Sequence, residues 1–594
     1  MSSGRLRVAV LRHARRLRGV AVWGAQDARA GCPVRADVAT GGFASYRSGG
    51  RRGHHSLSSR SGTWGGFRQR WVHIVALVVI SSLVGLLAPN GGARSRTPDG
   101  RQLRVRSVAT GATNAPAPHR PVVVLGGHAA NVAREATVSL GVGSWPVPTS
   151  FLGVSVEDTE LMNDFHHLAL FTRVMSDLQA PGSGPLILRI GGASADESFW
   201  DPQAGRPSWW PFAVTPQWLT ATSQLVRLLG LKAIVDLNVA ADDPGMAHSE
   251  ANAIRAAFPA RSVVAFEIGN EPDLYTANSW YQSLEILRDH DRVIRYSPAR
   301  YATVFGAYAR ALAPEHEALA GPALAYPHPE WIRRLIASDP GVPIITAHSY
   351  PYSACSTPSS PTYPTVGRLL SESATAGAAA ALAPEIDAAH RGGKPLRLTE
   401  MNSVTCGGVP GVSNTFATAL WAPDALFEMM RAGVDGVNMH VRARAINAAW
   451  VFGRTGLQAR PLLYGLAMFA RMLGPNARRL AVRVHMRGTA DLRIWAVVSG
   501  RDHLKLLLVN KSGEPLTVRL AIPCAGREAV QRLLASSPSA SAGVTLDGQS
   551  IGPDGGWHGV RARETVAGTA AGSVIAVSAY SAALVSFTEE LPTA

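Results

Sequence analysis

From residue 121 onward, short apolar runs recur along the chain, and segments with helical periodicity separate them. This alternation predicts βα units and a parallel sheet. The runs are eight in number: Phe151–Val156, Leu186–Ile190, Lys232–Asn238, Val263–Gly269, Leu319–Leu324, Pro343–Tyr350, Pro395–Glu400 and Val434–His440. Eight strands with intervening helices predict an α/β fold of the (β/α)8 TIM barrel type. The alternative is a doubly wound open sheet, which normally has a glycine-rich turn after its first strand. Here Glu157, Asp158 and Thr159 follow instead.

The pattern changes after a last barrel helix at Pro461–Leu473. Short alternating strands without helical periodicity predict a C-terminal β-sandwich domain. Its expected strands are Leu492–Val498, Leu504–Val509, Leu516–Ile522, Ala529–Leu533 and Ser573–Phe587, with Ala136–Gly141 completing the sandwich from the other end of the domain. We therefore expect a catalytic barrel over residues 134–460, and the last barrel helix with the sandwich over 461–594.

The first 133 residues have a different character. Residues 1–70 predict a basic, disordered tail, and residues 89–133, rich in Gly, Pro, Arg, Thr and Ala, predict a linker. Between them, Trp71–Ala88 contains only three polar residues and follows two arginines. This pattern predicts a signal peptide or a signal anchor, and so an extracellular or cell-surface protein that contacts the membrane if the segment is kept. A buried core helix is the alternative interpretation.

The net charge of +16 comes from this N-terminal region. Residues 1–120 contain 20 arginines, no lysine and three acids, whereas residues 121–594 carry 38 bases and 39 acids. The folded part is therefore nearly neutral, and its composition does not predict nucleic-acid binding. A groove for a long sulfated polyanion would need a local excess of basic residues, which is not visible at this level.

The four cysteines do not define a disulfide framework. Cys355 and Cys406 lie just beyond two predicted strand ends on the same barrel face, so they could form a disulfide in an exported protein. Two free buried thiols are equally compatible with the sequence.

Polar residues at the carboxyl ends of the predicted strands are the candidates for chemistry, because a parallel barrel builds its active site there. They form one set, which consists of Glu157, Arg189, Asn238, Asn270, Glu271, His348, Tyr350, Glu400, Asn438 and His440.

Two of these residues, Glu271 and Glu400, end the fourth and seventh strands and would face each other across the barrel mouth. At a separation of about 5 to 5.5 Å, one carboxyl can attack an anomeric carbon while the other protonates the leaving oxygen, and the configuration is retained. A wider gap would admit a water and invert the configuration. We expect Pro272 to hold Glu271 in an extended conformation.

Two neighbouring residues would support Glu400. Arg189 could keep this carboxyl ionised, and Tyr350 could donate a hydrogen bond to it. A purely structural ion pair for Arg189, and backbone hydrogen bonding for an inward-facing His348, are the alternatives. Motifs of serine hydrolases, zinc proteases and P-loop proteins are missing from the sequence, so no metal or organic cofactor is implied.

Three segments resemble glycoside hydrolase family 79, the β-glucuronidase and heparanase family of the retaining barrel clan. They are Leu188–Ser198 (LRIGGASADES), Gly269–Tyr275 (GNEPDLY) and Thr399–Ser403 (TEMNS), and the resemblance extends over roughly residues 134 to 590.

The resemblance implies specific roles for the residues in these segments. Glu271 would be the acid/base, Glu400 the nucleophile and Asn270 a ligand of the sugar 2-hydroxyl, with Tyr350 beside the nucleophile. A uronate carboxylate would meet backbone N–H groups near Cys406, Gly407 and Gly408. Family members often have a tyrosine in that loop, where this chain has Thr405. Further substrate contacts are expected from Glu157, Arg189, His348 and Asn402.

These features favour an exo-acting β-glucuronidase that takes a glucuronide or a uronic-acid-containing glycan as its substrate. A heparanase-type endo-β-glucuronidase and a β-glucosidase-type exo-glycosidase are alternative enzymes. A membrane-anchored carbohydrate-binding protein without activity is the non-enzymatic alternative. Replacement of either glutamate would favour this last interpretation, and both are present.

Overall fold

The computed structural model describes residues 134–205, 210–277, 288–289, 292–293, 296–500, 503–523 and 526–588. The tail, the apolar segment at 71–88, the linker up to residue 133, Cys32 and Cys524 lie outside the described residues. Within these ranges, no helix combines the length and the apolar character needed to cross a membrane.

Eight parallel strands close into a barrel, which confirms the predicted fold class. Each strand begins and ends within two residues of its predicted run. The strands are β2 (Leu152–Glu157), β3 (Ile187–Gly191), β6 (Lys232–Leu237), β7 (Val263–Ile268), β10 (Leu319–Leu324), β11 (Ile344–Ser349), β13 (Leu396–Met401) and β15 (Gly436–Val441). The barrel closes where β15 pairs with β2 and β7 pairs with β10. All the strand carboxyl ends therefore point to one mouth.

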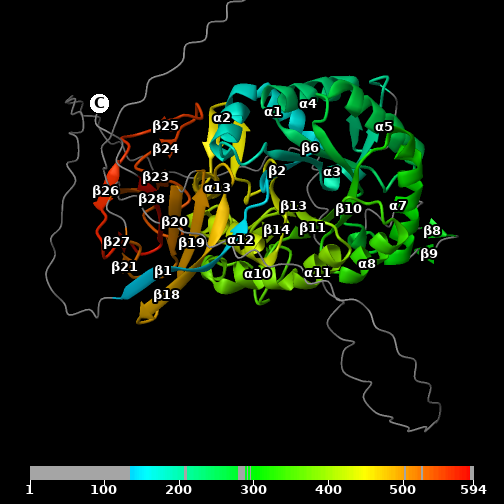
Figure 1. Ribbon diagram of the computed structural model, residues 1–594. Coiled ribbons are helices and arrows are strands. Elements are labelled where there is room, and N and C mark those ends of the chain that lie inside the picture. The colour runs from blue at the N-terminus through cyan, green and yellow to red at the C-terminus, as the bar shows by residue number, and fades with distance from the viewer. Residues whose placement is uncertain are drawn as a thin grey trace, which may run out of the picture.

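Helices surround the barrel (Figure 1). The longer ones are α2 (Leu168–Leu178), α4 (Pro216–Leu228), α5 (Pro244–Ala257), α7 (Pro298–Leu312), α8 (Pro329–Ser338), α11 (Ala383–Arg391), α12 (Phe416–Ala432) and α13 (Pro461–Met472). Short helices at the mouth and between these are α1 (Leu161–His166), α3 (Ala193–Asp196), α9 (Val366–Leu370) and α10 (Ala376–Ala381). Three of the long helices begin with a capping side chain followed by proline, a strong start signal: Thr215, Asp243 and Ser297 each accept a hydrogen bond from the backbone N–H three residues later.

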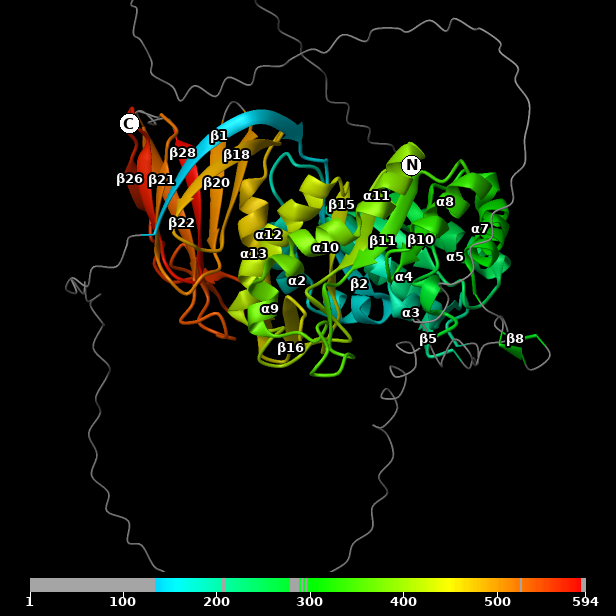
Figure 2. The same cartoon turned by 90° about the horizontal axis from the view of Figure 1, so that it is seen from below.

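The C-terminal region is mostly sheet. Ten of its strands form one sheet: β1 (Glu135–Pro146), β18 (Arg478–Arg487), β19 (Leu492–Ser499), β20 (His503–Asn510), β21 (Leu516–Leu520), β22 (Arg527–Leu534), β23 (Thr545–Leu546), β26 (Glu564–Ala567), β27 (Ser573–Val577) and β28 (Ser581–Thr588). The long, curved β1 joins β18 to β21, as Figure 2 shows, so the N-terminal strand completes this domain as predicted. The single strand predicted over residues 573–587 is wrong, because the chain turns after Val577 and forms β27 and β28.

Alternate residues of this sheet belong to two different cores, as the two-residue period of a strand requires. Leu506 and Leu508 of β20 pack in a core of the C-terminal domain, to which β1, β18, β19, β21, β22, β27 and β28 also contribute. Leu507 and Val509 join the core of the barrel.

The two parts of the molecule pack against each other through α12 and α13, which lie between the barrel and the sheet (Figures 1 and 2). Phe427 of α12 stacks on Trp495 of β19 at 5.2 Å between ring centroids. Asp424 accepts hydrogen bonds from Trp495 Nε1 and from Lys511 Nζ in a fully buried ion pair. The remaining strands are pairs in loops: β4 (Ser198–Trp200) with β5 (Phe212–Val214), β8 (Arg288–Asp289) with β9 (Arg292–Val293), β12 (Tyr352–Ser353) with β14 (Val404–Thr405), β16 (Trp450–Gly453) with β17 (Gly456–Ala459), and β24 (Ser550–Ile551) with β25 (Trp557–His558).

Candidate active site

The two predicted glutamates meet at the mouth of the barrel. One carboxylate oxygen of Glu271, one of Glu400 and one ring nitrogen of His348 all lie within 4.8 Å of one another. His348 Nδ1 is 3.0 Å from Glu271 Oε1 and 3.9 Å from Glu400 Oε2. Glu271 is partly open to solvent, whereas Glu400 and His348 are buried. Two carboxyls 129 positions apart in the sequence therefore share one space, with an imidazole between them.

The expectation of an extended Glu271 is wrong. Its φ of 48° and ψ of 50° lie in the left-handed region, which a non-glycine residue adopts at some cost. Two backbone hydrogen bonds hold this conformation: the Glu271 N–H donates to Ala323 O at 3.0 Å, and Leu274 N–H donates to Glu271 O at 2.8 Å. Proline therefore ends the strand here by a sharp turn, and the turn directs the glutamate toward His348.

Arg189 is the centre of the hydrogen bonding beneath Glu400. It is fully buried on β3, and its guanidinium donates from Nη1 to Glu400 Oε1 at 2.8 Å. Its Nε donates to Glu267 Oε2 at 2.7 Å, and its Nη2 donates to Asp236 Oδ2 at 3.0 Å. A fourth bond runs from Nη2 to Asn270 Oδ1. A planar, forked cation suits such a set of acceptors.

Sequence reasoning missed Asp236 and Glu267 as partners of Arg189. Both are charged residues inside otherwise apolar strands, β6 and β7, and both are buried. Thr399 Oγ1 also donates to Glu267 Oε1 at 2.8 Å. The available signal was the charge itself, since an ionised side chain in the middle of a buried strand needs a partner of opposite charge.

The surroundings of Glu400 favour its ionised form. Burial alone would raise the pKa of this carboxyl, but His440, His348 and Arg189, together with a hydrogen bond from Tyr350, outweigh burial and hold the pKa well below its usual range. Tyr350 Oη donates to Glu400 Oε2 at 2.7 Å. A permanently ionised carboxylate is the state that a nucleophile requires.

Glu157 and Asn270 lie at neighbouring strand ends. Glu157 is buried, accepts a hydrogen bond from the Ser194 N–H at 2.8 Å, and has His440 Nε2 at 3.4 Å and Arg442 Nε at 3.9 Å from Oε1. Asn270 uses its oxygen for Arg189, so its amide N–H groups are the side available to a ligand.

Three asparagines at the strand ends have structural partners. Asn402, expected to bind substrate, is fully buried; its amide donates to His440 O and Asn447 O, and its oxygen accepts from Ser403. Asn238 and Asn438 likewise bond to backbone groups or, for Asn438, to Arg397. With these bonds, the three side chains position strand ends and loops.

The loop after β13 carries the predicted N–H groups for a uronate. Cys406, Gly407 and Gly408 all have positive φ, of 57°, 76° and 86°. Cys406 N–H donates to Thr405 Oγ1 at 2.7 Å, and Gly408 N–H donates to Thr405 O at 3.4 Å. Two of the three groups are thus already engaged within the loop. Gly407 N–H makes no hydrogen bond to any residue that the structure describes.

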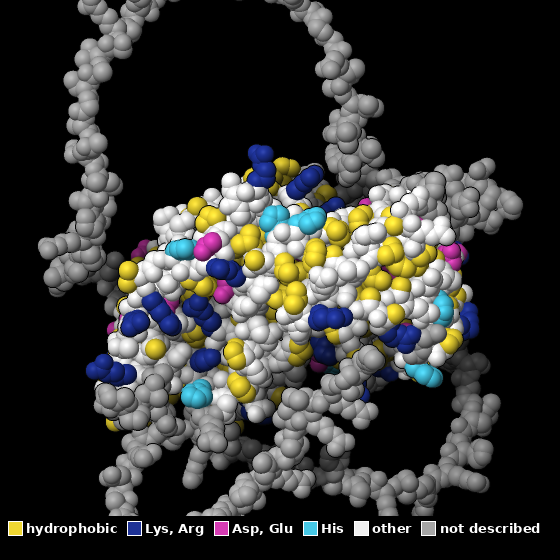
Figure 3. All heavy atoms as spheres, turned by 90° about the horizontal axis from the view of Figure 1, so that it is seen from above, with side chains coloured by type: hydrophobic (Ala, Val, Ile, Leu, Met, Phe, Trp, Pro, Cys, Tyr) yellow, Lys and Arg dark blue, Asp and Glu magenta, His cyan; other side chains and the backbone are white. Residues whose placement is uncertain are grey.

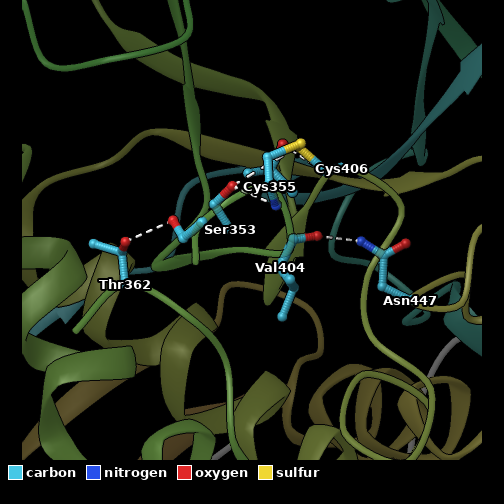
Figure 4. The surroundings of a disulfide bond; sticks show 8 residues. Ser353, Cys355, Thr362, Val404, Cys406 and Asn447 are labelled. Atoms are coloured by element: carbon cyan, nitrogen blue, oxygen red, sulfur yellow. Dashed lines mark hydrogen bonds between the residues drawn. A yellow bond between two sulfur atoms is a disulfide. The ribbon is translucent and has the colours of Figure 1, made fainter. Parts of the chain in front are cut away.

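A disulfide between Cys355 and Cys406 joins this loop to the loop after β11 (Figure 4). Asn447 Nδ2 donates to Val404 O beside it, and the Ile446 N–H donates to Gly407 O at 2.6 Å. Loops that follow three neighbouring barrel strands, β11, β13 and β15, are thereby tied together.

Within the part of the chain that the structure describes, Glu271, His348 and Glu400 form a group whose donor atoms lie close enough together to hold a metal ion. Arg189 already compensates the charge of Glu400, and His348 already contacts Glu271, so the arrangement suits proton transfer and nucleophilic attack.

Known proteins are similar to this chain in sequence or in fold. No family model matches the chain. The chain is similar to fungal β-glucuronidases. It is 27% identical over 314 residues to the β-glucuronidase of Neurospora crassa, which covers 42% of this chain and 55% of that protein. It is 26% identical over 182 residues to the β-glucuronidase of Aspergillus niger, covering 27% of this chain and 34% of that protein. The match thus spans about half the length of the first relative and about a third of the second.

Solved structures share the fold. A 4-O-α-L-rhamnosyl-β-D-glucuronidase from Fusarium oxysporum superimposes with a TM-score of 0.61 at 18% identity, over 76% of this chain and 99% of that one. A family 51 α-L-arabinofuranosidase from Bifidobacterium longum gives 0.56 at 14% identity, over 77% and 100%. At these identities the likeness concerns the architecture of barrel and sheet.

Proposed function

We propose that this protein is a retaining glycoside hydrolase that releases β-linked glucuronic acid, with Glu400 as nucleophile and Glu271 as acid/base. The observation that carries the proposal is the approach of the two carboxylates within 4.8 Å. Retaining enzymes have a carboxyl separation of about 5 to 5.5 Å, and inverting enzymes need roughly 6.5 to 9.5 Å to admit a water. The pair here is too close for the second arrangement.

The reaction takes two displacements. Glu400 attacks the anomeric carbon, the glycosidic C–O bond breaks, and Glu271 gives its proton to the departing oxygen. Glu271 then takes a proton from a water, whose oxygen attacks the same carbon and expels the Glu400 carboxylate. Arg189 and Tyr350 hold Glu400 before attack and stabilise its charge again on departure. Asn270, fixed by Arg189, presents its N–H groups to a hydroxyl next to the anomeric carbon.

Support for a uronic acid comes from the similarity to β-glucuronidases and from groups that would attract a carboxylate. The N–H of Gly407 in the disulfide-tied loop and the partly exposed guanidinium of Arg442 are of this kind. Figure 3 shows the basic side chains of the described residues scattered over one face rather than gathered in one band. The near-neutral charge of residues 121–594 favours a terminal glucuronide over a long sulfated chain, and so exo action over a heparanase-type endo action.

The test compares the full chain on p-nitrophenyl β-glucuronide, p-nitrophenyl β-glucoside and heparan sulfate. We expect turnover of the first, with β-glucuronic acid as the first anomer seen by NMR. Glu400→Ala should abolish turnover, whereas Glu372→Gln, an exposed glutamate outside the barrel mouth, should leave it unchanged. Preference for the glucoside would move the assignment to a β-glucosidase, and cleavage of internal heparan sulfate bonds to an endo-enzyme. An inactive parent would leave a carbohydrate-binding protein.

We also propose that the protein works outside the cytosol, at the cell surface or secreted. The Cys355–Cys406 disulfide supports this proposal, because such bonds persist in oxidising compartments. The apolar residues 71–88 would be the signal peptide or the membrane anchor. N-terminal sequencing of protein from the extracellular and membrane fractions tests both ideas. A mature start after residue 88 identifies a signal peptide, a retained segment in the membrane fraction identifies an anchor, and confinement to the cytosol would contradict the proposal.

A further inference from the structure

His440 lies between two carboxylates at the barrel mouth. It is the penultimate residue of β15, whose neighbours in the barrel are β13 with Glu400 and β2 with Glu157. Its Nδ1 lies 3.3 Å from Glu400 Oε2, and its Nε2 lies 3.4 Å from Glu157 Oε1. The side chain is 14% exposed. One imidazole thus has an acidic oxygen on each side, within the range of a charge contact.

The hydrogen bonds around Tyr350 fix where the protons are. Its hydroxyl lies 2.7 Å from Glu400 Oε2 and 2.7 Å from His440 Nδ1. A tyrosine has one hydrogen to donate, and an ionised Glu400 can only accept. Tyr350 therefore donates to Glu400 and accepts from His440, so Nδ1 carries a hydrogen. The other nitrogen, Nε2, faces Glu157 Oε1 without an aligned hydrogen bond. An N–H at this position is favoured over a lone pair that would face a carboxylate.

We propose that His440 is a positioning residue that stands as an imidazolium between Glu157 and Glu400 and commits the Tyr350 hydroxyl to the nucleophile. The inference rests on the proposed function of Glu400. The histidine acts through Tyr350 and through its charge. It takes no part in bond making at the sugar.

The other charged groups around His440 are compatible with this state. From β3, Arg189 opposes a second cation, but its charge is shared among three acids. From β11, His348 is closest to Glu271. Arg442, which follows β15, is exposed, and its Nε lies 3.9 Å from Glu157 Oε1, the oxygen that His440 also faces. Burial lowers the pKa of His440, but Glu400 and Glu157 outweigh burial and raise it above its ordinary value. Burial likewise raises the pKa of Glu157, but His440 and Arg442 bring the net shift below its ordinary value.

The proposal predicts that the proton on His440 depends on the reaction cycle. When Glu400 forms its ester with the sugar, its negative charge disappears, and Glu157 remains as the one carboxylate beside the ring. The imidazolium is then less stable, and it releases a proton to solvent at a lower pH than in the free enzyme. An opposite charge within about 4 to 6 Å typically changes a pKa by 1 to 3 units. We therefore expect the pKa of His440 to fall by about 1 unit or more.

The experiment follows the 13Cε1 signal of His440 by NMR in the full chain, assigned by its loss in His440→Gln. The protein is titrated free and after reaction with a 2-deoxy-2-fluoro-β-glucuronyl fluoride, which forms a slowly hydrolysed ester with a nucleophilic carboxylate. The proposal is supported if the free enzyme titrates above the ordinary histidine value and the ester form titrates lower. The proposal is overturned if mass spectrometry shows that the ester has formed but the pKa of His440 does not fall. If mass spectrometry shows no added sugar, the assignment of Glu400 as the nucleophile fails. A pKa of His440 at or below the ordinary histidine value in the free enzyme separately overturns the proposed imidazolium.

Variants separate the charge from a merely structural role. His440→Gln keeps a hydrogen-bond donor but no charge, so the acid limb of kcat/KM, which reports ionisation of Glu400, should move to higher pH. Glu157→Gln should lower the pKa of His440 in the NMR titration. The matched control is His390→Gln, at a surface histidine that is paired with Asp435. It should change neither the acid limb of kcat/KM nor the pKa of His440. A His440→Gln variant with lower thermal stability and an unmoved acid limb would assign the residue to packing alone.

Discussion

The buried cluster around Arg189 predicts that two neighbouring acids respond in opposite ways to the same chemical change. Asp236 and Glu267 both accept a hydrogen bond from this guanidinium, and both are fully buried. Three acids, counting Glu400, surround one cation. Burial, followed by repulsion from Glu267 and Asp196, outweighs Arg189 and raises the pKa of Asp236 well above its ordinary value. We therefore predict that Asp236, rather than Glu267, holds a proton more readily than an ordinary aspartate.

The hydrogen bonds agree with this assignment. Asp236 Oδ2 accepts from Arg189, and Oδ1 is buried without an acceptor or donor among the described residues. Both oxygens of Glu267 accept, one from Arg189 and one from Thr399. Asp236→Asn exchanges one neutral group for another of the same shape. Glu267→Gln removes a buried charge that neutralises Arg189, and breaking such a pair costs about 3 to 5 kcal/mol.

Thermal unfolding of the full chain, followed by circular dichroism at pH 7, checks the contrast. One kcal/mol shifts the Tm of a domain of 150 to 250 residues by about 2 to 4 °C. We therefore expect Glu267→Gln to lower the Tm by on the order of 5 °C or more. Asp236→Asn should raise the Tm, because the aspartate ionises in the unfolded parent at pH 7 whereas asparagine cannot. Equal losses in both variants would show that Asp236 is a charged partner of Arg189 and would refute the reasoning.

The pH dependence adds a second test of the same assignment. A carboxyl whose pKa is raised by folding contributes stability below its unfolded value of about 3.8, and this contribution is lost as the pH rises toward the folded-state pKa. Asp236→Asn has no such loss. Its stability relative to the parent should therefore increase from pH 4 upward, and a constant difference across this range would contradict a neutral Asp236.

Three further predictions use other parts of the molecule. Burial raises the pKa of Glu250 to about 8, so its ionisation opposes folding above its ordinary value of 4.5; Glu250→Gln should be more stable by on the order of 3 kcal/mol at pH 7 in urea unfolding, with no gain below pH 4, and matching midpoints at pH 7 would contradict this. Tyr350→Phe removes a hydrogen bond to Glu400, so the acid limb of kcat/KM should move up by about 1 pH unit, and an unchanged limb would count against that bond. Replacing Cys355 and Cys406 by serine opens a loop with a sequence separation of 51 residues, which should cost up to about 4 kcal/mol in urea unfolding; an unchanged midpoint would mean that the bond adds no stability.

The barrel could be predicted from the sequence because its strands are buried on both faces. Such strands appear as continuous apolar runs, and β10 has the same bounds as its predicted run. The meeting of Glu271 and Glu400 follows from the same topology, since all parallel strands end at one mouth. The C-terminal sheet was harder, because an alternating pattern gives no sign of a tight turn. The break between β27 and β28 was lost for this reason.

The details of the site depend on contacts that no local pattern contains. The left-handed backbone of Glu271 is held by Ala323, 52 positions away, and the rule for a residue before proline describes only the local preference. The sequence predicts that Asn402 binds substrate. Its amide donates to one carbonyl of β15 and to one of the loop that follows β15, neither of which is near Asn402 in the sequence.

The charges inside the barrel explain why the nucleophile can be both buried and ionised. A buried carboxyl whose charge is incompletely compensated has a raised pKa, as Asp236 does. Glu400 does not, because Arg189 below it and His440 beside it supply positive charge, while Tyr350 supplies a hydrogen. Two acids within reach of the same guanidinium therefore have pKa values shifted in opposite directions. The two pKa values differ because positive charge lies at the barrel mouth. There His440 lies next to Glu400, which also faces Glu271.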